Sequence, residues 1–428
     1  MALLLTGLLT LVCCGLLLWG TVRRERIYEF PFLAGAVVAG WILPQAIGLI
    51  GDPFLPADGL EMALVMTILC AGMCYLGYVW KAPGPFWPQW DFDMGRLEKG
   101  AAALTLFGGG FYVALSRLPE EQITATQYEG TPVAFLFFAD TLAYGFAISL
   151  LIFSRTSSRL ALMLALIGSS FYLERIIFSG RRGDVVQLVL MVLLAAWFQR
   201  KKTIPLPAMI GALLLGALEF NNIDQYRAMV LSNSDRDWAK VSEIDYLGGM
   251  ETLAKEGGEE FKNAVYNIAA TQAATSYDFG IFHWNMLVFN YVPAQLVGQD
   301  LKEALTLDMP QPALSNFGYA ANVGATETGM SDAFGSFWFF GALKFFFIAA
   351  VMGIIFRAAS SGDIVAQIFY MVMAPNALHA ITHHTQWFLS PWVHMIIFLY
   401  PVLYYARVAG QQPGTAAGSP HHERVDHV

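Results

Sequence analysis

Long apolar runs separated by short polar segments are the main feature of this chain. Each run comes close to the roughly 20 residues that a helix needs to cross the hydrocarbon core of a bilayer. The runs lie at residues 1–20, 31–50, 60–79, 101–116, 132–153, 159–173, 185–199, 204–219, 333–357, 364–382 and 388–406. The pattern predicts an all-α polytopic membrane protein with about eleven transmembrane helices.

Composition agrees with this class. Hydrophobic residues make up 56% and charged residues 14% of the 428 positions, whereas soluble domains carry about 25% charged residues. The first run has no basic segment before it and no small-residue cleavage site after it, so we interpret it as an anchor. All four cysteines fall within apolar runs, where we expect them to pack and to form no disulfide.

The basic residues between the runs predict the orientation of the helices. Short segments rich in Lys and Arg belong in the cytoplasm. Such segments follow the odd-numbered runs, at residues 23–26, 81–99, 155–159, 200–202, 357 and 407. The segments after the second and fourth runs are mainly acidic. We therefore expect the N-terminus outside and the C-terminus in the cytoplasm.

The longest polar segment predicts a separate outer domain. Residues 220–330 hold fourteen Asp and Glu against six Lys and Arg, a net charge of −8. An acidic surface of this size argues against nucleic-acid binding. The expected divisions are transmembrane helices at 1–219, a large external loop domain at 220–332, transmembrane helices at 333–407 and a disordered cytoplasmic tail at 408–428.

One external segment breaks the charge rule. Residues 179–184 read Ser-Gly-Arg-Arg-Gly-Asp, so Arg181 and Arg182 join Arg175 on the side where basic residues are disfavoured. An anionic ligand would compensate for this charge, because a guanidinium binds phosphate oxygens bidentately. The two glycines permit a tight turn, and the aspartate can cap the next helix. Pairing with acids of the outer domain, or with lipid head groups, is the alternative.

Three stretches carry a resemblance to a known family. They are 179–184, Asn-Tyr-Val-Pro-Ala-Gln-Leu-Val-Gly at 290–298, and Gly-Ala-Thr-Glu-Thr-Gly-Met-Ser-Asp-Ala-Phe-Gly at 324–335. With the many spans and one large external loop, they resemble the bacterial O-antigen and exopolysaccharide repeat-unit polymerases, which are related to O-antigen ligases. The loop lacks a clear ligase-type histidine motif, which favours a polymerase over a ligase.

The resemblance implies a GT-C-like glycosyltransferase in the bacterial inner membrane. Such an enzyme moves a growing glycan from undecaprenyl diphosphate to a sugar hydroxyl of the next lipid-linked repeat unit, on the outer face of the membrane. It implies no cofactor and no metal. The implied partners are the undecaprenyl-diphosphate-linked oligosaccharide, membrane lipid, a chain-length regulator and a flippase, and no nucleic acid.

This reaction needs positive charge at the leaving diphosphate and a general base at the attacking hydroxyl. The candidates for holding the diphosphate are Arg175, Arg181 and Arg182. The candidates for the catalytic base are Asp332, Glu327 and His283. Asp332 and Glu327 are preferred for their place in the last motif. Other interpretations are a helix N-cap for Asp332, a solvated loop acid for Glu327 and a hydrogen-bonded loop histidine for His283.

Aromatic and histidine side chains near the predicted outer ends are candidates for glycan contacts. They are Trp284, Tyr291, His383 and His384. His379 and His383 stand four residues apart on one helix face, so with Asp332 they could hold a metal, but no specific metal-binding spacing supports this. A structural role at the membrane interface is the alternative for all of these side chains.

Two other functions stay open. An O-antigen-ligase-like transferase would use the same donor with a different acceptor. A transporter or flippase of lipid-linked glycan would place charges or broken helices near the bilayer midplane. Here most runs lack central charges, with Lys344 as an exception, and this pattern favours an enzyme that works at the membrane surface.

Overall fold

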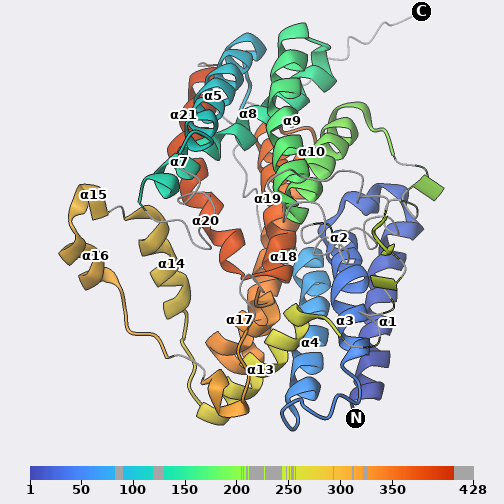
Figure 1. Cartoon of the computed structure of the whole chain (residues 1–428). Coiled ribbons are helices and arrows are strands. Elements are labelled where there is room, and N and C mark those ends of the chain that lie inside the picture. Colours follow the sequence, from blue (N-terminus) through green and yellow to red (C-terminus); the bar gives the residue numbers. More distant parts are fainter. Residues whose placement is uncertain are drawn as a thin grey trace, which may run out of the picture.

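The computed structural model of the chain describes residues 1–81, 90–118, 130–203, 257–292, 294–310, 313–321 and 326–408, with isolated positions between 205 and 255. Every regular element in this part of the chain is a helix, and an isolated bridge between Phe92 and Arg407 is its one β-type pairing. The predicted all-helical class is confirmed (Figure 1). The predicted tail at 408–428 lies outside the described residues, apart from Val408.

Nine helical stretches of the described chain are long and apolar enough to cross a membrane. They are Ala2–Val22, Phe30–Gly48, Gly59–Val79, Thr131–Thr156, Arg159–Ser179, Arg182–Arg200, Gly329–Ser360, Ile364–Thr382 and Gln386–Ala406. Each overlaps one predicted run, which confirms a helical polytopic membrane protein. The predicted run at 204–219 falls almost entirely outside the described residues.

Four of these stretches are interrupted. The uninterrupted helices are α1 (Ala2–Val22), α4 (Gly59–Val79), α9 (Arg159–Ser179), α10 (Arg182–Arg200) and α19 (Ile364–Thr382). Single π-helical segments separate α2 (Phe30–Val37) from α3 (Leu43–Gly48) and α20 (Gln386–His394) from α21 (Tyr400–Ala406). Breaks at Asp140 and Trp338 separate α7 (Thr131–Ala139) from α8 (Thr141–Thr156) and α17 (Gly329–Phe337) from α18 (Leu343–Ser360).

The predicted run at 101–116 forms part of α5 (Met94–Leu115), which begins earlier than expected. The Asp93 side chain caps this helix by accepting hydrogen bonds from the backbone N–H groups of Gly95 and Arg96, at 2.9 and 3.0 Å. Arg96, Glu98 and Lys99 make the first turns of α5 polar. For this reason α5 is not one of the nine apolar stretches.

Contacts between helix termini fall into two groups, one at each end of the helix bundle. At the first, which we call the capped end, basic side chains donate to backbone carbonyls: Arg357 to Tyr78 and Trp80, Arg200 to Ser154, and Lys201 to Ser360. At the second, which we call the α13 end, α13 (Glu259–Ala274) contacts the chain around α3 and α4: Phe261 with Gln45, Lys262 with Asp52, and Tyr266 with Phe54. The orientation of the helices in the membrane, and the side on which each end lies, stay predictions.

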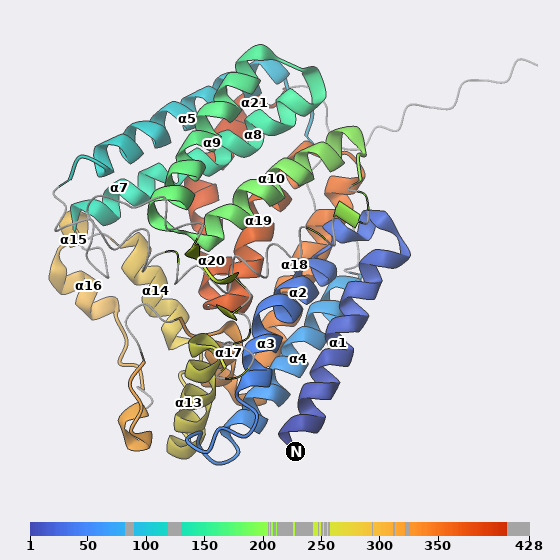
Figure 2. The ribbon, with the colours of Figure 1, turned by 45° about the vertical axis from the view of Figure 1, so that its right-hand side comes forward.

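Small residues bring several helices into close contact. Gly77 of α4 lies against the backbone of Phe346 in α18, and Gly145 of α8 lies against Thr105 of α5. A side chain at either glycine would collide with its neighbour, so glycine permits the approach, as small residues do between membrane helices. Figure 2 shows α5 and α8 running side by side.

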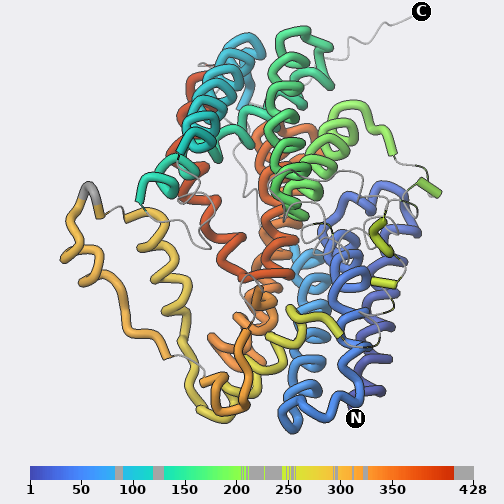
Figure 3. The backbone as a smooth tube through the Cα atoms, viewed as in Figure 1, coloured from blue at the N-terminus to red at the C-terminus, as the bar shows by residue number. Residues whose placement is uncertain are grey.

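The described part of the predicted external domain shares its core with the membrane helices. Phe261, Ala264, Val265 and Ile268 of α13 belong to the same buried hydrophobic cluster as side chains of α4 and α17. The next helices, α14 (Ile281–Tyr291), α15 (Ala294–Val297) and α16 (Gln299–Leu305), form an arm on the left of Figure 3. The domain boundaries at 220 and 332 stay predictions.

Candidate functional site

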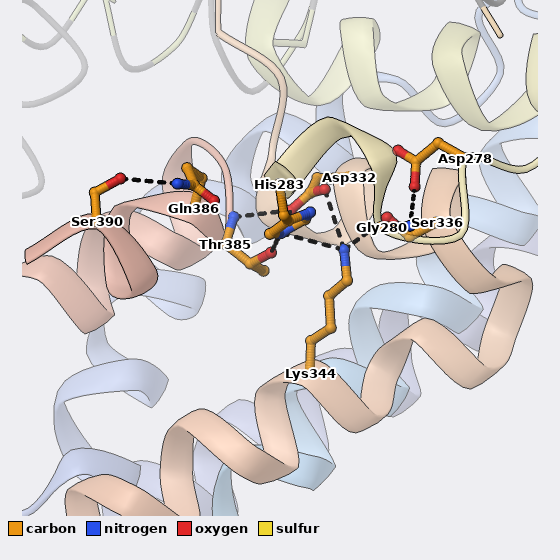
Figure 4. Close-up of polar contacts among 9 residues, drawn as sticks. All are labelled: Asp278, Gly280, His283, Asp332, Ser336, Lys344, Thr385, Gln386 and Ser390. Atoms are coloured by element: carbon orange, nitrogen blue, oxygen red, sulfur yellow. Dashed lines mark hydrogen bonds and ion pairs between the residues drawn. The ribbon is translucent and has the colours of Figure 1, made fainter. Parts of the chain in front are cut away.

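A network of buried polar side chains joins four segments at the α13 end. Asp332, in the first turn of α17, is 7% exposed. Its carboxylate accepts hydrogen bonds from the backbone N–H and the hydroxyl of Thr385, at 2.8 and 2.5 Å, and pairs with the Lys344 ammonium at 3.2 Å. Lys344 also donates to the Ser336 hydroxyl at 2.7 Å. Figure 4 shows these groups converging with His283.

The break in the Gly329–Ser360 stretch positions the ion pair of this network. Backbone N–H groups from the segment before α14 donate to the last carbonyls of α17 at 3.0 and 3.2 Å, which satisfies this helix end. Trp338 then adopts a φ of 54°, and the chain turns before α18 begins. Lys344 in the first turn of α18 points back toward Asp332 (Figure 4). The two charges therefore neutralise each other inside an apolar stretch.

His283 extends the network from α14. Its Nε2 lies 2.7 Å from the Thr385 hydroxyl, 3.4 Å from Lys344 Nζ and 3.7 Å from a carboxylate oxygen of Asp332. The Thr385 hydroxyl donates its one proton to Asp332, so we assign the proton of the neutral imidazole to Nε2, which donates to Thr385 and leaves the free lone pair on Nδ1. In this assignment the Lys344 ammonium lies beside Nε2–H and does not donate to it. Nδ1 is buried and has no hydrogen-bond partner among the described residues. His283 thus presents a proton-accepting nitrogen in a fixed orientation.

Burial determines the protonation of the histidine. Desolvation lowers the pKa of His283, the Lys344 ammonium lowers it further, and the Asp332 carboxylate opposes both effects. A pKa below the ordinary value of about 6.5 keeps the imidazole neutral at pH 7. His283 can therefore accept a proton at neutral pH, as a general base must.

The alternative interpretations of the two predicted acids do not fit the structure. The N-cap of α17 is Thr328, whose hydroxyl accepts from the Ser331 N–H at 3.4 Å, so Asp332 is not the cap. Glu327 is half-buried and not a fully solvated loop acid. Burial raises the pKa of Glu327, while His384 opposes the rise and Asp332 adds to it. Asp332 is therefore an ion-paired member of the network, and Glu327 flanks it.

Three arginines lie where α9 ends and α10 begins: Arg175, Arg181 and Arg182. We call this junction the arginine loop, and its three charges have different surroundings. Arg175 forms an ion pair with both carboxylate oxygens of Asp184, with Nε at 2.8 Å from Oδ2. Its charge is already matched, and Asp184 does not cap α10. Arg182 pairs with Glu260 of α13 at 3.1 Å. Arg181 is exposed and has no ion pair among the described residues, so it is the arginine best placed for an added anion.

The end of α19 connects the arginine loop with the histidines. Gly183 of α10 faces the His379 ring so closely that a side chain at this glycine would collide with it. The rings of His379 and His383 both pack against Trp387, with centroid distances of 5.3 and 5.7 Å. Burial, the neighbouring histidines and Arg182 lower the pKa of His383 to about 3. This histidine is therefore neutral and contributes no charge for an anion.

The residues after His383 connect the end of α19 with the buried network around His283. The His384 ring lies 5.1 Å from that of Phe282, next to His283 on α14. Three polar atoms of this region are buried without a hydrogen-bond partner among the described residues: His283 Nδ1, His384 Nδ1 and Gln386 Oε1. Buried polar atoms are normally satisfied, so these three atoms retain hydrogen-bonding capacity that the described residues leave unused.

The predicted glycan-binding aromatic residues hold the arm in place. Trp284 donates its indole N–H to the Leu305 carbonyl at 2.8 Å, which joins α14 to the end of α16. Tyr291 donates its hydroxyl to the Ser390 carbonyl of α20 and packs edge-on against Phe137. Trp284 is 46% exposed, so its ring stays accessible. Binding of glycan by either residue stays a prediction.

Sequence reasoning missed three members of the network. Lys344 gave a signal as a single charge in an apolar run, but nothing in the sequence indicated its partner. Thr385 and Ser336 gave no signal, because their roles depend on contacts between segments far apart in the chain. In the described chain no group of three or more His, Cys, Asp or Glu side chains could hold a metal ion.

Comparisons of the chain with protein-family models, with curated proteins and with solved structures found no match. The resemblance to repeat-unit polymerases therefore stays a prediction. What the site can do follows from its own residues: a neutral histidine that accepts a proton, a buried ion pair that orients it, and an exposed arginine at the neighbouring loop.

Proposed function

We propose that this chain is a glycosyltransferase that joins oligosaccharide repeat units carried on undecaprenyl diphosphate, on the outer face of the bacterial inner membrane. The observation that carries the proposal is His283, whose buried Nδ1 has no partner among the described residues while Nε2 is held through Thr385 by Asp332. The arginine loop lies beside the same end of α19. A base for a hydroxyl and a cation for a diphosphate are what this transfer requires.

The proposed reaction uses His283 as the general base. Nδ1 takes the proton from a hydroxyl of the acceptor sugar, whose oxygen then bonds to the anomeric carbon of the donor glycan. The bond between that carbon and the phosphate oxygen breaks, and undecaprenyl diphosphate leaves. The imidazolium that forms is stabilised through Thr385 by the Asp332 carboxylate, as in other relays that orient a histidine base. The proton then passes to water.

The cations have separate roles in this proposal. Arg181 contacts the leaving diphosphate, whose charge grows as the glycosidic bond breaks. Arg182 can join it when a phosphate takes the place of Glu260, its partner at 3.1 Å. Lys344 keeps Asp332 ionised and in position. Arg175 acts through structure, since its pairing with Asp184 holds the two ends of the loop together.

A transporter of lipid-linked glycan is the second candidate, and one observation favours it. The Gly329–Ser360 stretch is broken, and it carries the buried pair of Asp332 and Lys344. Broken helices with internal charges are typical of transporters. A transporter needs no proton-accepting histidine for bond formation, so the loss of bond formation in a His283 variant separates the two functions.

The test is polymer formation in a bacterial host that lacks its own polymerase and supplies the cognate lipid-linked repeat unit. The wild-type chain should extend the units, and His283→Gln and Arg181→Ala should accumulate single units at matched expression. Arg357→Ala, which alters a cation at the capped end, is the control and should extend them normally. Unlinked units with the wild type, or normal polymer with His283→Gln, would contradict the proposed function.

A further inference from the structure

Asp140 is an ionisable residue inside a membrane-length stretch that the proposed reaction does not use. It lies at the break between α7 and α8, where it is the C-cap of one helix and the N-cap of the next. The hydroxyl of Thr141 donates to the Phe138 carbonyl at 2.7 Å, which competes with the regular helix hydrogen bonds at this turn. The Asp140 side chain has accessible surface at the break, but surrounding protein atoms desolvate it, so we regard it as lining the interior of the break and not as a fully solvated group.

Asp140 differs from the other described carboxylates within the nine stretches, because each of those has a partner. The pairs are Glu61 with the amino terminus, Glu174 with Tyr112, Asp184 with Arg175, and Asp332 with Lys344. The Asp140 side chain makes no hydrogen bond or ion pair with the described residues, and although Asp140 occupies the N-cap position of α8, its carboxylate makes no capping hydrogen bond. A charged group in a membrane span is costly without a partner, so its presence points to function.

The surroundings of Asp140 connect it with the arginine loop. His394 of α20 lies 2.7 Å from the Tyr144 hydroxyl and 2.6 Å from the Phe137 carbonyl, so α20 contacts the chain on both sides of the break. The Asp140 carboxylate is within electrostatic reach of His394, of the Arg175–Asp184 ion pair and, more weakly, of Arg181. Arg181 is also exposed and lacks an ion pair among the described residues. Asp140 and Arg181 therefore lie within electrostatic reach of each other, and neither has an ion pair among the described residues.

We propose that Asp140 and Arg181 together bind a sugar diphosphate, with Arg181 on the phosphate and Asp140 accepting hydrogen bonds from hydroxyls of the adjoining sugar. This inference rests on the proposed function and specifies which part of the lipid-linked substrate occupies the arginine loop. A carboxylate repels a bare diphosphate, but it favours a ligand that brings hydroxyl donors beside its phosphates. Asp140 thereby distinguishes the sugar-bearing substrate from the lipid diphosphate that the transfer releases.

The test compares two probes that differ only in the sugar, farnesyl diphosphate and farnesyl diphospho-N-acetylglucosamine. Their dissociation constants are measured on the full chain in lipid nanodiscs. The wild type should prefer the sugar-bearing probe by about ten- to a hundredfold, the range of hydrogen bonds to a charged group. Asp140→Asn should weaken that probe by about tenfold or more and bind the bare diphosphate as well as the wild type or better. Arg181→Ala should weaken both.

Two further variants keep the test decisive. Asp140→Glu retains the carboxylate and should recover part of the preference, and Asp300→Asn removes an exposed carboxylate on α16 and should leave both affinities unchanged. An Asp140→Asn variant that keeps the wild-type preference, or that weakens both probes equally, would overturn this inference alone. A wild type that binds neither probe would overturn the diphosphate site of the proposed function and this inference with it.

Discussion

The two ends of the helix bundle use charged side chains in different ways. At the capped end, Arg357, Arg200 and Lys201 donate to backbone carbonyls at the ends of neighbouring helices. Such contacts satisfy the free carbonyls at helix C-termini, where the negative end of the helix dipole also attracts a positive charge. At the α13 end, the buried Asp332 pairs with the half-buried Lys344, and polar atoms beside them lack partners among the described residues.

This difference separates charges that hold the structure together from charges that can act on a ligand. A basic side chain at a helix end donates its hydrogen bonds to the carbonyls there. It can be replaced at a small cost in stability. A buried ion pair that orients a histidine with a free nitrogen leaves part of its hydrogen-bonding capacity unused. The comparison therefore predicts large effects of substitution at the α13 end and small ones at the capped end.

The largest effect is expected from Asp332→Ala. It leaves the Lys344 ammonium buried without its carboxylate, which should destabilise the protein by about 3–5 kcal/mol and abolish transfer. The measurement is thermal unfolding in detergent together with polymer formation. The double variant Asp332→Asn/Lys344→Met removes both charges. It should therefore recover much of the stability that Asp332→Ala loses, but it should not recover transfer. A single Asp332→Ala variant as stable as the wild type would show that the pair is not buried in the working protein.

His283→Gln should lower the transfer rate by about 10²–10⁴-fold, the usual contribution of a general base. Glutamine can still donate a hydrogen bond to Thr385, so the melting temperature should change little. The measurement is the rate of lipid diphosphate release by the purified protein in proteoliposomes. A glutamine variant with the wild-type rate would assign the base to another group, and Asp332 and Glu327 are the remaining predicted candidates.

The pH profile should report the same histidine. Because burial lowers the pKa of His283, the base stays deprotonated from pH 8 down to the ordinary histidine value of about 6.5. The transfer rate should therefore be flat over that interval and fall only at lower pH. The acid limb should disappear from the residual activity of His283→Gln. A rate that already falls between pH 8 and 7 would contradict a lowered pKa.

The three arginines of the loop should differ from one another. Arg181→Ala should reduce transfer by about a hundredfold, the effect of losing one group that stabilises transition-state charge, while stability changes by less than about 0.5 kcal/mol. Arg175→Ala should instead destabilise the fold by about 3–5 kcal/mol, because Asp184 loses its partner. Paired unfolding and transfer assays measure both. Equal behaviour of the two variants would remove the distinction between a free and a matched arginine.

The smallest effect is expected at the capped end. Arg357→Ala removes two hydrogen bonds to backbone carbonyls at 3.1 and 3.2 Å. The carbonyls can turn to water, so stability should fall by about 1 kcal/mol and the transfer rate should not change. Thermal unfolding and the same transfer assay give both values. A strong loss of transfer would mean that the capped end takes part in the reaction.

Hydropathy was sufficient to predict most of the fold. An apolar run of membrane length leaves the backbone no alternative to a helix, so nine of the eleven predicted runs coincide with the nine helical stretches. The breaks were not predictable, because the turn at Trp338 depends on backbone N–H groups of the segment before α14 that bond the end of α17. Asp140 also lies in an apolar run without a local signal for a break.

The candidate site was predicted in part. His283, Asp332 and Glu327 could be selected by residue type and place. The structure brings His283 within 3.7 Å of Asp332, and Glu327 lies within electrostatic reach of Asp332. Their connection through Thr385 and Lys344 could not be predicted, because it depends on the turn after α19 and on the break before α18. The arginines were predicted as a group, whereas their different partners follow from the fold.

The most direct test of the account measures the chemistry itself. Purified full-length protein in proteoliposomes is given the cognate lipid-linked repeat unit, and released undecaprenyl diphosphate is counted against new glycosidic bonds. The account predicts one lipid diphosphate for each bond formed by the wild type and almost none from His283→Gln. Movement of intact lipid-linked units across the bilayer, with no bond formed and no diphosphate released, would contradict it and favour a transporter.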